Sequence, residues 1–174
     1  ASVAAEIGGS EESGSSGGRA FCFLPLPART GLPVHVNAYF ELSSNRRDIW
    51  FGGDMAGGGA ARSEWNQSLL ERVVAPAYAR LLERAAETLG NVAAYLSLLP
   101  RGRPPEPWGG VVRATCAAIV DLRVLYTRAD GGRWITPREA TFPDPELERN
   151  PELAEALWAQ GEPLADAPPE ALAC

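Results

Sequence analysis

The sequence predicts an α+β fold in which an antiparallel hairpin or sheet is packed by helices. Apolar and polar residues alternate from Val34 to Leu42, which is the period of a strand with one buried face. Further along, apolar residues recur at helical spacing from Trp65 to Leu82. With 174 residues, the chain is long enough for one ordinary domain or for two small lobes that share a core.

The first eighteen residues predict a disordered linker. Residues 1–18 are rich in Gly, Ser and Glu, and they contain too little apolar surface to offset the entropy of ordering them. The chain starts at Ala1 and lacks the basic and then apolar segments of a secretory signal. We therefore expect a piece of a longer protein.

Two strands are expected after this linker. Residues 20–26 form an aromatic and apolar run bounded by Gly and Pro, and Pro25 indicates that this strand lies at an edge or ends early. Residues 27–31 have turn chemistry, so the run and the alternating segment are expected to form an antiparallel hairpin. The expected core-facing residues are Val34, Val36, Ala38, Phe40 and Leu42, with His35, Asn37, Tyr39 and Glu41 on the opposite side.

A helical half follows the polar stretch 43–48 and the glycine-rich loop 52–61. Ser63 is the expected N-cap, and helical spacing continues up to Gly90. Pro76 lies inside this run, where it removes a backbone hydrogen bond, so we expect a kink or a split into two helices. The first lobe then spans residues 19–100, and residues 101–110 are a Pro/Gly-rich connector.

Residues 111–174 form the smaller α+β lobe in this interpretation. A helix is expected over 111–121, a short strand over 124–126, and a turn at 130–132 that leads into a second apolar segment. The last helix has the clearest signals, with Asn150 as N-cap, Pro151 in the first position and Gly161 just past the end.

Composition excludes several classes of function. The net charge is −6, and the arginines do not cluster with aromatic residues, so nucleic-acid binding is disfavoured. No apolar run approaches the roughly 20 residues that span a bilayer, so no membrane partner is expected. Cys22, Cys116 and Cys174 form no C-x-x-C pair, which predicts neither a disulfide framework nor a zinc site. A reducing, cytoplasmic location is the expectation.

No set of residues predicts independent catalysis. The glycine-rich loop lacks the Lys and Ser or Thr of a phosphate-binding P-loop, because Gly59 and Ala60 stand in those places. His35 is the sole histidine, so neither a histidine metal site nor a Ser/His/Asp triad is supported. Scattered carboxylates could suggest acid/base catalysis, but they lie around a helix start, where a solvated face is expected; they are Glu146, Glu148, Glu152 and Glu155.

The segment Asn45-Arg46-Arg47-Asp48 is the strongest binding candidate. Two adjacent guanidinium groups after a strand can present donors to a phosphate or to a carboxylate. The alternative is a structural ion pair with Asp48 or Glu41, which the residues alone favour.

Several segments of the chain, which follow one another in the same order, resemble the sacsin repeat. The resemblance covers nearly everything after the linker, through residues 18–27, 30–37, 42–50, 62–66, 73–78, 124–126, 132–135 and 161–164. In that family each repeat begins with an Hsp90-like ATPase module. The resemblance places this chain downstream of such a module, in the position of the Hsp90 middle domain.

The resemblance implies a role in a chaperone. The chain would couple the state of the upstream ATPase module to protein clients or co-chaperones, with ATP and Mg²⁺ held by that module and no cofactor in this chain. Arg46 or Arg47 would reach the γ-phosphate, as an arginine finger does, and Asn45, Asp48 and Trp50 would lie at the interdomain surface. The alternative is a non-enzymatic interaction scaffold without nucleotide chemistry.

Overall fold

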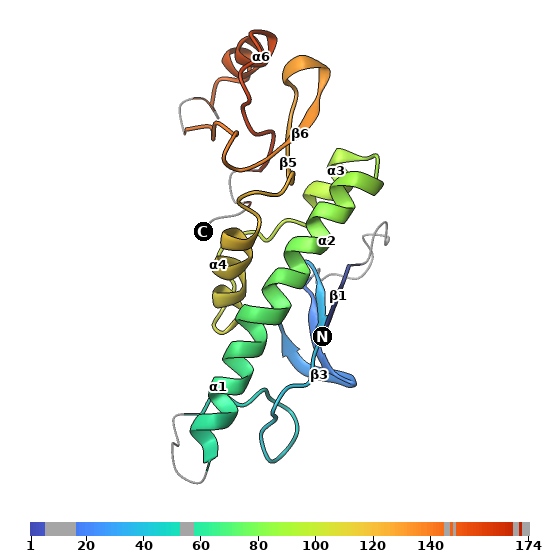
Figure 1. The fold of residues 1–174 in the computed structure, drawn as a ribbon, viewed down its shortest axis with the longest axis vertical. Coiled ribbons are helices and arrows are strands. Elements are labelled where there is room, and N and C mark those ends of the chain that lie inside the picture. Colours follow the sequence, from blue (N-terminus) through green and yellow to red (C-terminus); the bar gives the residue numbers. More distant parts are fainter. Residues whose placement is uncertain (6–16, 53–57, 145–146, 148, 169–170, 172–174) are drawn as a thin grey trace.

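The chain folds into helices and short strands that share one main core. The computed structural model describes all residues except 6–16, 53–57, 145–146, 148, 169–170 and 172–174. A four-stranded sheet lies beside a long helical rod, and a two-stranded sheet and the last helix lie at one end of the molecule (Figure 1). The predicted α+β class is confirmed.

The four-stranded sheet has the order β1-β4-β2-β3. Its strands are β1 (Ser2–Ala4), β2 (Arg19–Cys22), β3 (Leu24–Arg29) and β4 (His35–Asn37). β2 pairs with β3 in an antiparallel manner and with β4 in a parallel manner, while β1 is antiparallel to β4.

The expected hairpin between residues 20–26 and 34–42 is therefore wrong. Phe23 adopts a left-handed conformation, with φ of 60°, so the chain reverses inside the predicted first strand. Residues 24–29 fold back on residues 19–22 and form the hairpin there. The Asn37 side chain supports this reversal, because its Oδ1 accepts a hydrogen bond from the Phe23 N–H at 3.3 Å.

The sheet's two edges differ in kind. β3 carries Pro25 at one edge, as predicted, since proline has no N–H to donate to a further strand. β1 forms the other edge, so the predicted disorder of residues 1–18 is wrong for Ser2–Ala4, and residues 6–16 lie outside the described part. Gly18 is also held in place, because its N–H donates to the Leu32 carbonyl at 2.6 Å and its carbonyl accepts from the Thr30 N–H at 3.0 Å.

The alternation after Pro33 produces the predicted core. Val34, Val36, Ala38 and Phe40 are buried, while Leu42 is half-buried and packs against the same cluster. His35 lies outside this core, as expected, and its Nδ1 accepts a hydrogen bond from the Arg19 N–H at 3.0 Å.

The long helical rod comprises α1 (Gly59–Leu69), a π-helical turn η2 (Leu70–Val74) and α2 (Ala75–Thr88). Ser63 lies inside α1, so the predicted helix start is wrong; the left-handed Gly58 precedes the first turn instead. The helix continues through Pro76 without the expected split, and it widens instead into a π-helical turn just before this residue (Figure 1). The Ala75 N–H bonds five residues back to the Leu70 carbonyl, and Pro76 follows in the first turn of α2.

The remaining elements are α3 (Val92–Leu96), α4 (Trp108–Ala118), β5 (Leu125–Thr127), the 3₁₀ turn η3 (Ala129–Gly131), β6 (Arg133–Ile135) and α6 (Pro151–Ala159). β5 and β6 form an antiparallel pair. The predicted cap of the last helix is confirmed, because the Asn150 Oδ1 accepts from the Leu153 N–H at 3.3 Å. Gly161 follows this helix with φ of 84°, a conformation that favours glycine.

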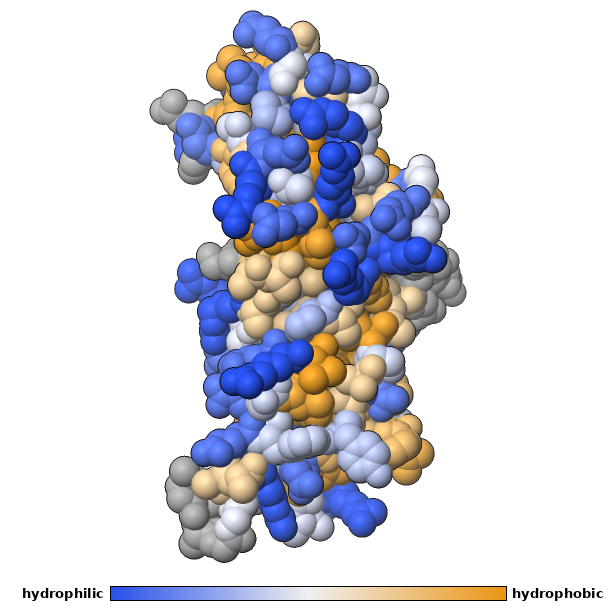
Figure 2. Space-filling view, viewed as in Figure 1, coloured by the Kyte–Doolittle hydropathy of each residue, from blue (hydrophilic) through white to orange (hydrophobic). Residues whose placement is uncertain are grey.

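The main core extends across the 101–110 connector. Trp108, Val111 and Val112 of α4 belong to the same buried cluster as the strand residues, and Trp108 meets Phe40 edge-on with ring centroids 6.5 Å apart. A small second cluster contains Leu125, Ile135 and Ala165. In Figure 2 hydrophobic side chains gather across the middle of the face, where α4 lies beside α2, and hydrophilic ones dominate the end that carries α6.

Two cysteines lie in the described part of the chain. Cys22 has a free thiol, which donates to the Phe40 carbonyl at 3.6 Å. Cys116 on α4 is disulfide-bonded, which the prediction of no disulfide framework did not anticipate. None of the helices in the described ranges is both long and apolar enough to cross a bilayer.

Candidate functional site

The predicted arginine pair lies in a turn whose two sides are tied together by backbone hydrogen bonds. Leu42 and Ile49 form an isolated antiparallel bridge. The Ser43 N–H donates to the Asp48 carbonyl at 2.9 Å, and the Trp50 N–H donates to the Glu41 carbonyl at 2.9 Å. The turn is therefore closed at its base.

Side chains fix the tip of this turn. The Asn45 Oδ1 accepts from the Arg47 N–H at 3.0 Å and from the Ser43 hydroxyl at 2.6 Å. The Asp48 N–H donates to the Ser43 hydroxyl oxygen at 3.2 Å. Arg46 has φ of 55°, an uncommon left-handed conformation for a side chain of this size. Asn45 thus shapes the turn, and its side chain is engaged within it.

The two guanidinium groups point into solvent from this turn. Arg46 and Arg47 are exposed, and neither forms an ion pair with any residue in the described ranges. The alternative structural pair with Asp48 or Glu41 is therefore not observed there. The Glu41 carboxylate instead faces Arg62 of α1, with Nε and Oε2 3.9 Å apart.

Asn66 holds the base of the turn against α1, and the sequence analysis missed it. Its side chain is fully buried. The Oδ1 accepts from the Glu41 N–H at 2.9 Å, and the Nδ2 donates to the Glu41 carbonyl at 2.8 Å and to the Trp50 carbonyl at 2.9 Å. One side-chain amide therefore hydrogen-bonds to the backbone before the turn, at Glu41, and after it, at Trp50, as a neighbouring strand would. A polar residue inside an amphipathic helix was the only available signal.

Trp50 anchors the turn to the start of the same helix. Its indole N–H donates to the Gly59 carbonyl at 3.0 Å, and the ring is half-buried. A Cβ on Gly52 would lie 2.7 Å from this ring, which explains a glycine there. Of the predicted surface residues, Trp50 therefore positions the turn, and Asp48 is exposed beside the arginines.

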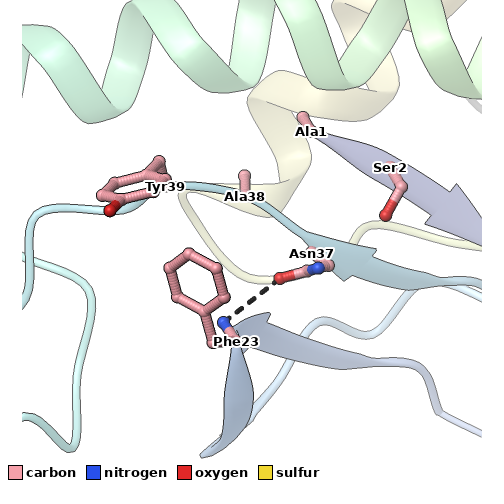
Figure 3. Close-up of a pocket in the computed structure, with 6 residues that line it drawn as sticks. All are labelled: Ala1, Ser2, Phe23, Asn37, Ala38 and Tyr39. Atoms are coloured by element: carbon pink, nitrogen blue, oxygen red, sulfur yellow. Dashed lines mark hydrogen bonds between the residues drawn. The ribbon is translucent and has the colours of Figure 1, made fainter.

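Exposed aromatic side chains lie next to the turn, and we call Phe23, Tyr39 and Trp65 the aromatic patch. Their exposed fractions are 72%, 70% and 52%. Phe23 and Tyr39 meet edge-on with centroids 5.1 Å apart, and the Trp65 indole donates to the Tyr39 carbonyl at 3.0 Å. Figure 3 shows Phe23 and Tyr39 beside Asn37. The alternation of residues 34–42 predicted Tyr39 on the outer face, but no sequence pattern indicated that Phe23 and Trp65 lie beside it.

The other candidates do not gather into a site. His35 contacts Phe21 edge-on, with centroids 5.8 Å apart. Glu152 is exposed in the first turn of α6, Glu155 pairs with Arg128, and Glu146 and Glu148 lie outside the described residues, as do residues 53–57 of the glycine loop. Where the structure describes the chain, no three His, Cys, Asp or Glu side chains lie close enough to hold a metal ion.

Comparison with known proteins identifies one stretch of the chain. Sixty-four residues, 37% of this chain, are 53% identical to human sacsin. Part of the chain is sacsin-related. The match spans 1% of the length of sacsin, and it does not assign the chain to a particular repeat or domain of that protein. No family model matches the chain. No solved structure matches it.

Proposed function

We propose that this chain is the middle-domain-like segment of a sacsin-type, Hsp90-related chaperone. It would couple the nucleotide state of an upstream ATPase module to the binding of a client or co-chaperone. The similarity to human sacsin supports the family, and the α+β architecture is compatible with this position. The chain itself would hold no nucleotide.

The observation on which this proposal rests is the preorganised arginine turn. Arg46 and Arg47 are exposed and unpaired within the described residues, on a turn tied at its base and clamped by a buried amide. A cationic group aimed at transferred phosphoryl charge is effective when its support does not have to reorganise. This turn meets that requirement, because its backbone is already fixed.

The arrangement fits a contact in trans with another module. An exposed guanidinium has five N–H donors and stays charged, so it can bind γ-phosphate oxygens on a surface that docks against the turn. The aromatic patch lies next to the turn, because Tyr39 is two residues before Glu41 and its carbonyl accepts the hydrogen bond from the Trp65 indole. Aromatic residues of this kind are enriched at protein interfaces.

The test is ATP hydrolysis by this chain joined to the ATPase module that precedes it in its parent protein. Arg46→Ala or Arg47→Ala should lower the hydrolysis rate by roughly 10³-fold if that residue acts as an arginine finger. Arg72→Ala is the matched control, since Arg72 is exposed on η2 and forms no ion pair in the described ranges. Rates within about twofold of wild type in both variants and in their double variant would reject the arginine role.

The chain alone should not bind ATP. Calorimetric titration with ATP and Mg²⁺ is expected to give no heat of binding, because Gly59 and Ala60 stand where a P-loop has Lys and Ser or Thr. Micromolar binding would overturn the assignment of nucleotide chemistry to another module.

The aromatic patch favours a second candidate, a non-enzymatic interaction scaffold. Phe23, Tyr39 and Trp65 remain more than half exposed, although each has substantial apolar surface. The sequence immediately upstream in the parent protein distinguishes the two candidate functions. A magnesium-binding Asn on a helix and an Asp-x-Gly-x-Gly loop there would favour the ATPase-coupled role, and their absence would favour the scaffold.

A further inference from the structure

The edge strand β1 lies in a groove between β4 and α2. Its register pairs Ser2 with Asn37, Val3 with Val36 and Ala4 with His35, and α2 packs against its other side. Val3 points inward and packs against the main core, while Ser2 and Ala4 line the outer face with His35 and Asn37. This is the geometry in which an extended peptide adds to a sheet beside a helix.

β1 has few contacts with which to hold this place. It comprises three residues, of which Ser2 and Ala4 are exposed and Val3 is only half-buried. It is joined to β2 through residues 5–18, which are rich in Gly and Ser. A strand this short gains little stability from hydrogen-bonded pairing alone, so β1 depends on the surrounding groove to keep its place.

The groove continues beyond the start of β1 into a hollow. The hollow has a volume of about 380 Å³ and is lined by Ala1, Ser2, Phe23, Asn37, Ala38 and Tyr39. Figure 3 shows the β1 end of this hollow beside the helix, with Phe23 and Tyr39 at the other end. An occupant extended by one residue before Ala1 would place that side chain toward Tyr39, on the face shared by Ser2 and Asn37.

We propose that the groove between β4 and α2 is a binding site for an extended peptide, and that β1 is its exchangeable occupant in this chain. The ligand is an uncharged strand with a β-branched residue at the inward position and small residues on both sides, as in Ser2-Val3-Ala4. An apolar residue at its amino-terminal end would enter the aromatic-lined hollow. Among the residues that the structure describes, no Asp, Glu, Lys or Arg lines the hollow, which selects against charged peptides.

The experiment uses the full chain with Val3→Asp, which places a charge at the inward position and expels β1. A fluorescent peptide with the sequence of residues 1–5 is titrated with this variant, and binding is followed by anisotropy. The variant should bind the peptide at least tenfold more tightly than the wild-type chain does, because β1 competes in the wild type. A peptide with Asp in place of Val3 should bind about tenfold more weakly, the cost expected for losing the apolar contacts of a half-buried valine side chain.

Controls make each outcome decisive. Val73→Asp introduces the same change at an exposed valine of η2 and should bind peptide as the wild type does. Val3→Gly removes the inward side chain without adding a charge and should also bind peptide. The proposal is wrong if neither Val3 variant binds peptide better than Val73→Asp. It is equally wrong if both Val3 variants lose the wild-type helical circular dichroism, since β1 would then be required for the fold.

A peptide with one added leucine at its amino terminus tests the hollow separately. It should bind the Val3→Asp chain several-fold more tightly than the unextended peptide, because the leucine side chain is transferred from water to the hollow beside Phe23 and Tyr39. Tyr39→Ser should remove this gain while leaving the affinity for the unextended peptide unchanged. A gain that persists in Tyr39→Ser would place the added residue elsewhere.

Discussion

Removing the Asn66 amide should loosen the arginine turn and lower the stability of the whole domain. Asn66→Ala deletes three hydrogen bonds, two to Glu41 and one to the Trp50 carbonyl. At about 1 kcal/mol net for each bond the loss is roughly 3 kcal/mol. The Glu41 carbonyl keeps its bond from the Trp50 N–H, and Glu41 is exposed, so water can offset part of the loss. We expect a decrease of about 2 to 3 kcal/mol in the free energy of unfolding.

The assay is urea unfolding followed by circular dichroism, in which the dependence of the unfolding free energy on urea concentration is compared between variants. A loss of this size should lower the thermal midpoint by about 5 to 10 °C in a domain of this length. Gln67→Ala is the matched control, because Gln67 is the next residue of α1, is exposed, and its side chain bonds to Glu71 one turn along. It should change stability by no more than about 0.5 kcal/mol. If Asn66→Ala costs no more than Gln67→Ala, the clamp does not hold the turn.

Two further variants test other parts of the fold. Burial raises the pKa of the Tyr78 and Tyr95 phenols above the usual range, so the folded chain keeps protons that the unfolded chain loses above about pH 10. These groups should therefore leave the urea midpoint unaffected below about pH 9 and lower it as the pH rises past 10. Tyr95→Phe should reduce that fall. The same fall of the urea midpoint in Tyr95→Phe and in the wild type would contradict this. Arg128 bonds to Asp166 and Glu155 and lies 4.3 Å from the centre of the Trp158 ring. Arg128→Ala should speed hydrogen exchange in β5 and α6 and lower the free energy of unfolding by about 1 kcal/mol. Arg138→Ala breaks one exposed ion pair and should do neither. Equal effects of the two variants would contradict a stabilising role for the Arg128 contacts.

Features set by local chemistry could be predicted from the sequence. The alternation of Val34, Val36, Ala38 and Phe40 correctly predicted which side chains are buried, because neighbouring residues of an extended chain face opposite sides. The start and end of α6 were also predicted, since an N-cap needs only the side chain of Asn150 and the N–H three residues on.

Features set by distant contacts could not be predicted in this way. The direction of β4 relative to β2 depends on the reversal at Phe23, where a non-glycine residue takes a left-handed conformation that no residue pattern announces. The sequence predicted β1 as part of a linker, because three residues at the start of a segment rich in Gly, Ser and Glu become a strand only when a neighbouring edge accepts them. Asn66 bonds to residues 25 and 16 positions away, so its role was invisible before the fold was known.

The candidate site shows the same division. The role of the arginine pair stays a prediction from the sequence, and its alternative as an ion pair with Glu41 could be judged only once Glu41 was seen to face Arg62. The fixed shape of the turn depends on Ser43, Asn45 and Asn66 together, and only the first two lie in the same segment.

The segment from Val34 to Trp50 serves two proposed surfaces whose variants should act independently. Its first part is β4, whose edge accepts β1, and its last part is the arginine turn, which is held by Asn66 on α1 and not by β1. Val3→Asp should therefore leave ATP hydrolysis by the joined protein unchanged, and Arg46→Ala should leave peptide affinity unchanged. A lower rate of ATP hydrolysis in Val3→Asp, or a lower peptide affinity when Arg46→Ala is added to Val3→Asp, would mean that β4 transmits strain from one surface to the other, and that the two proposals describe one coupled site.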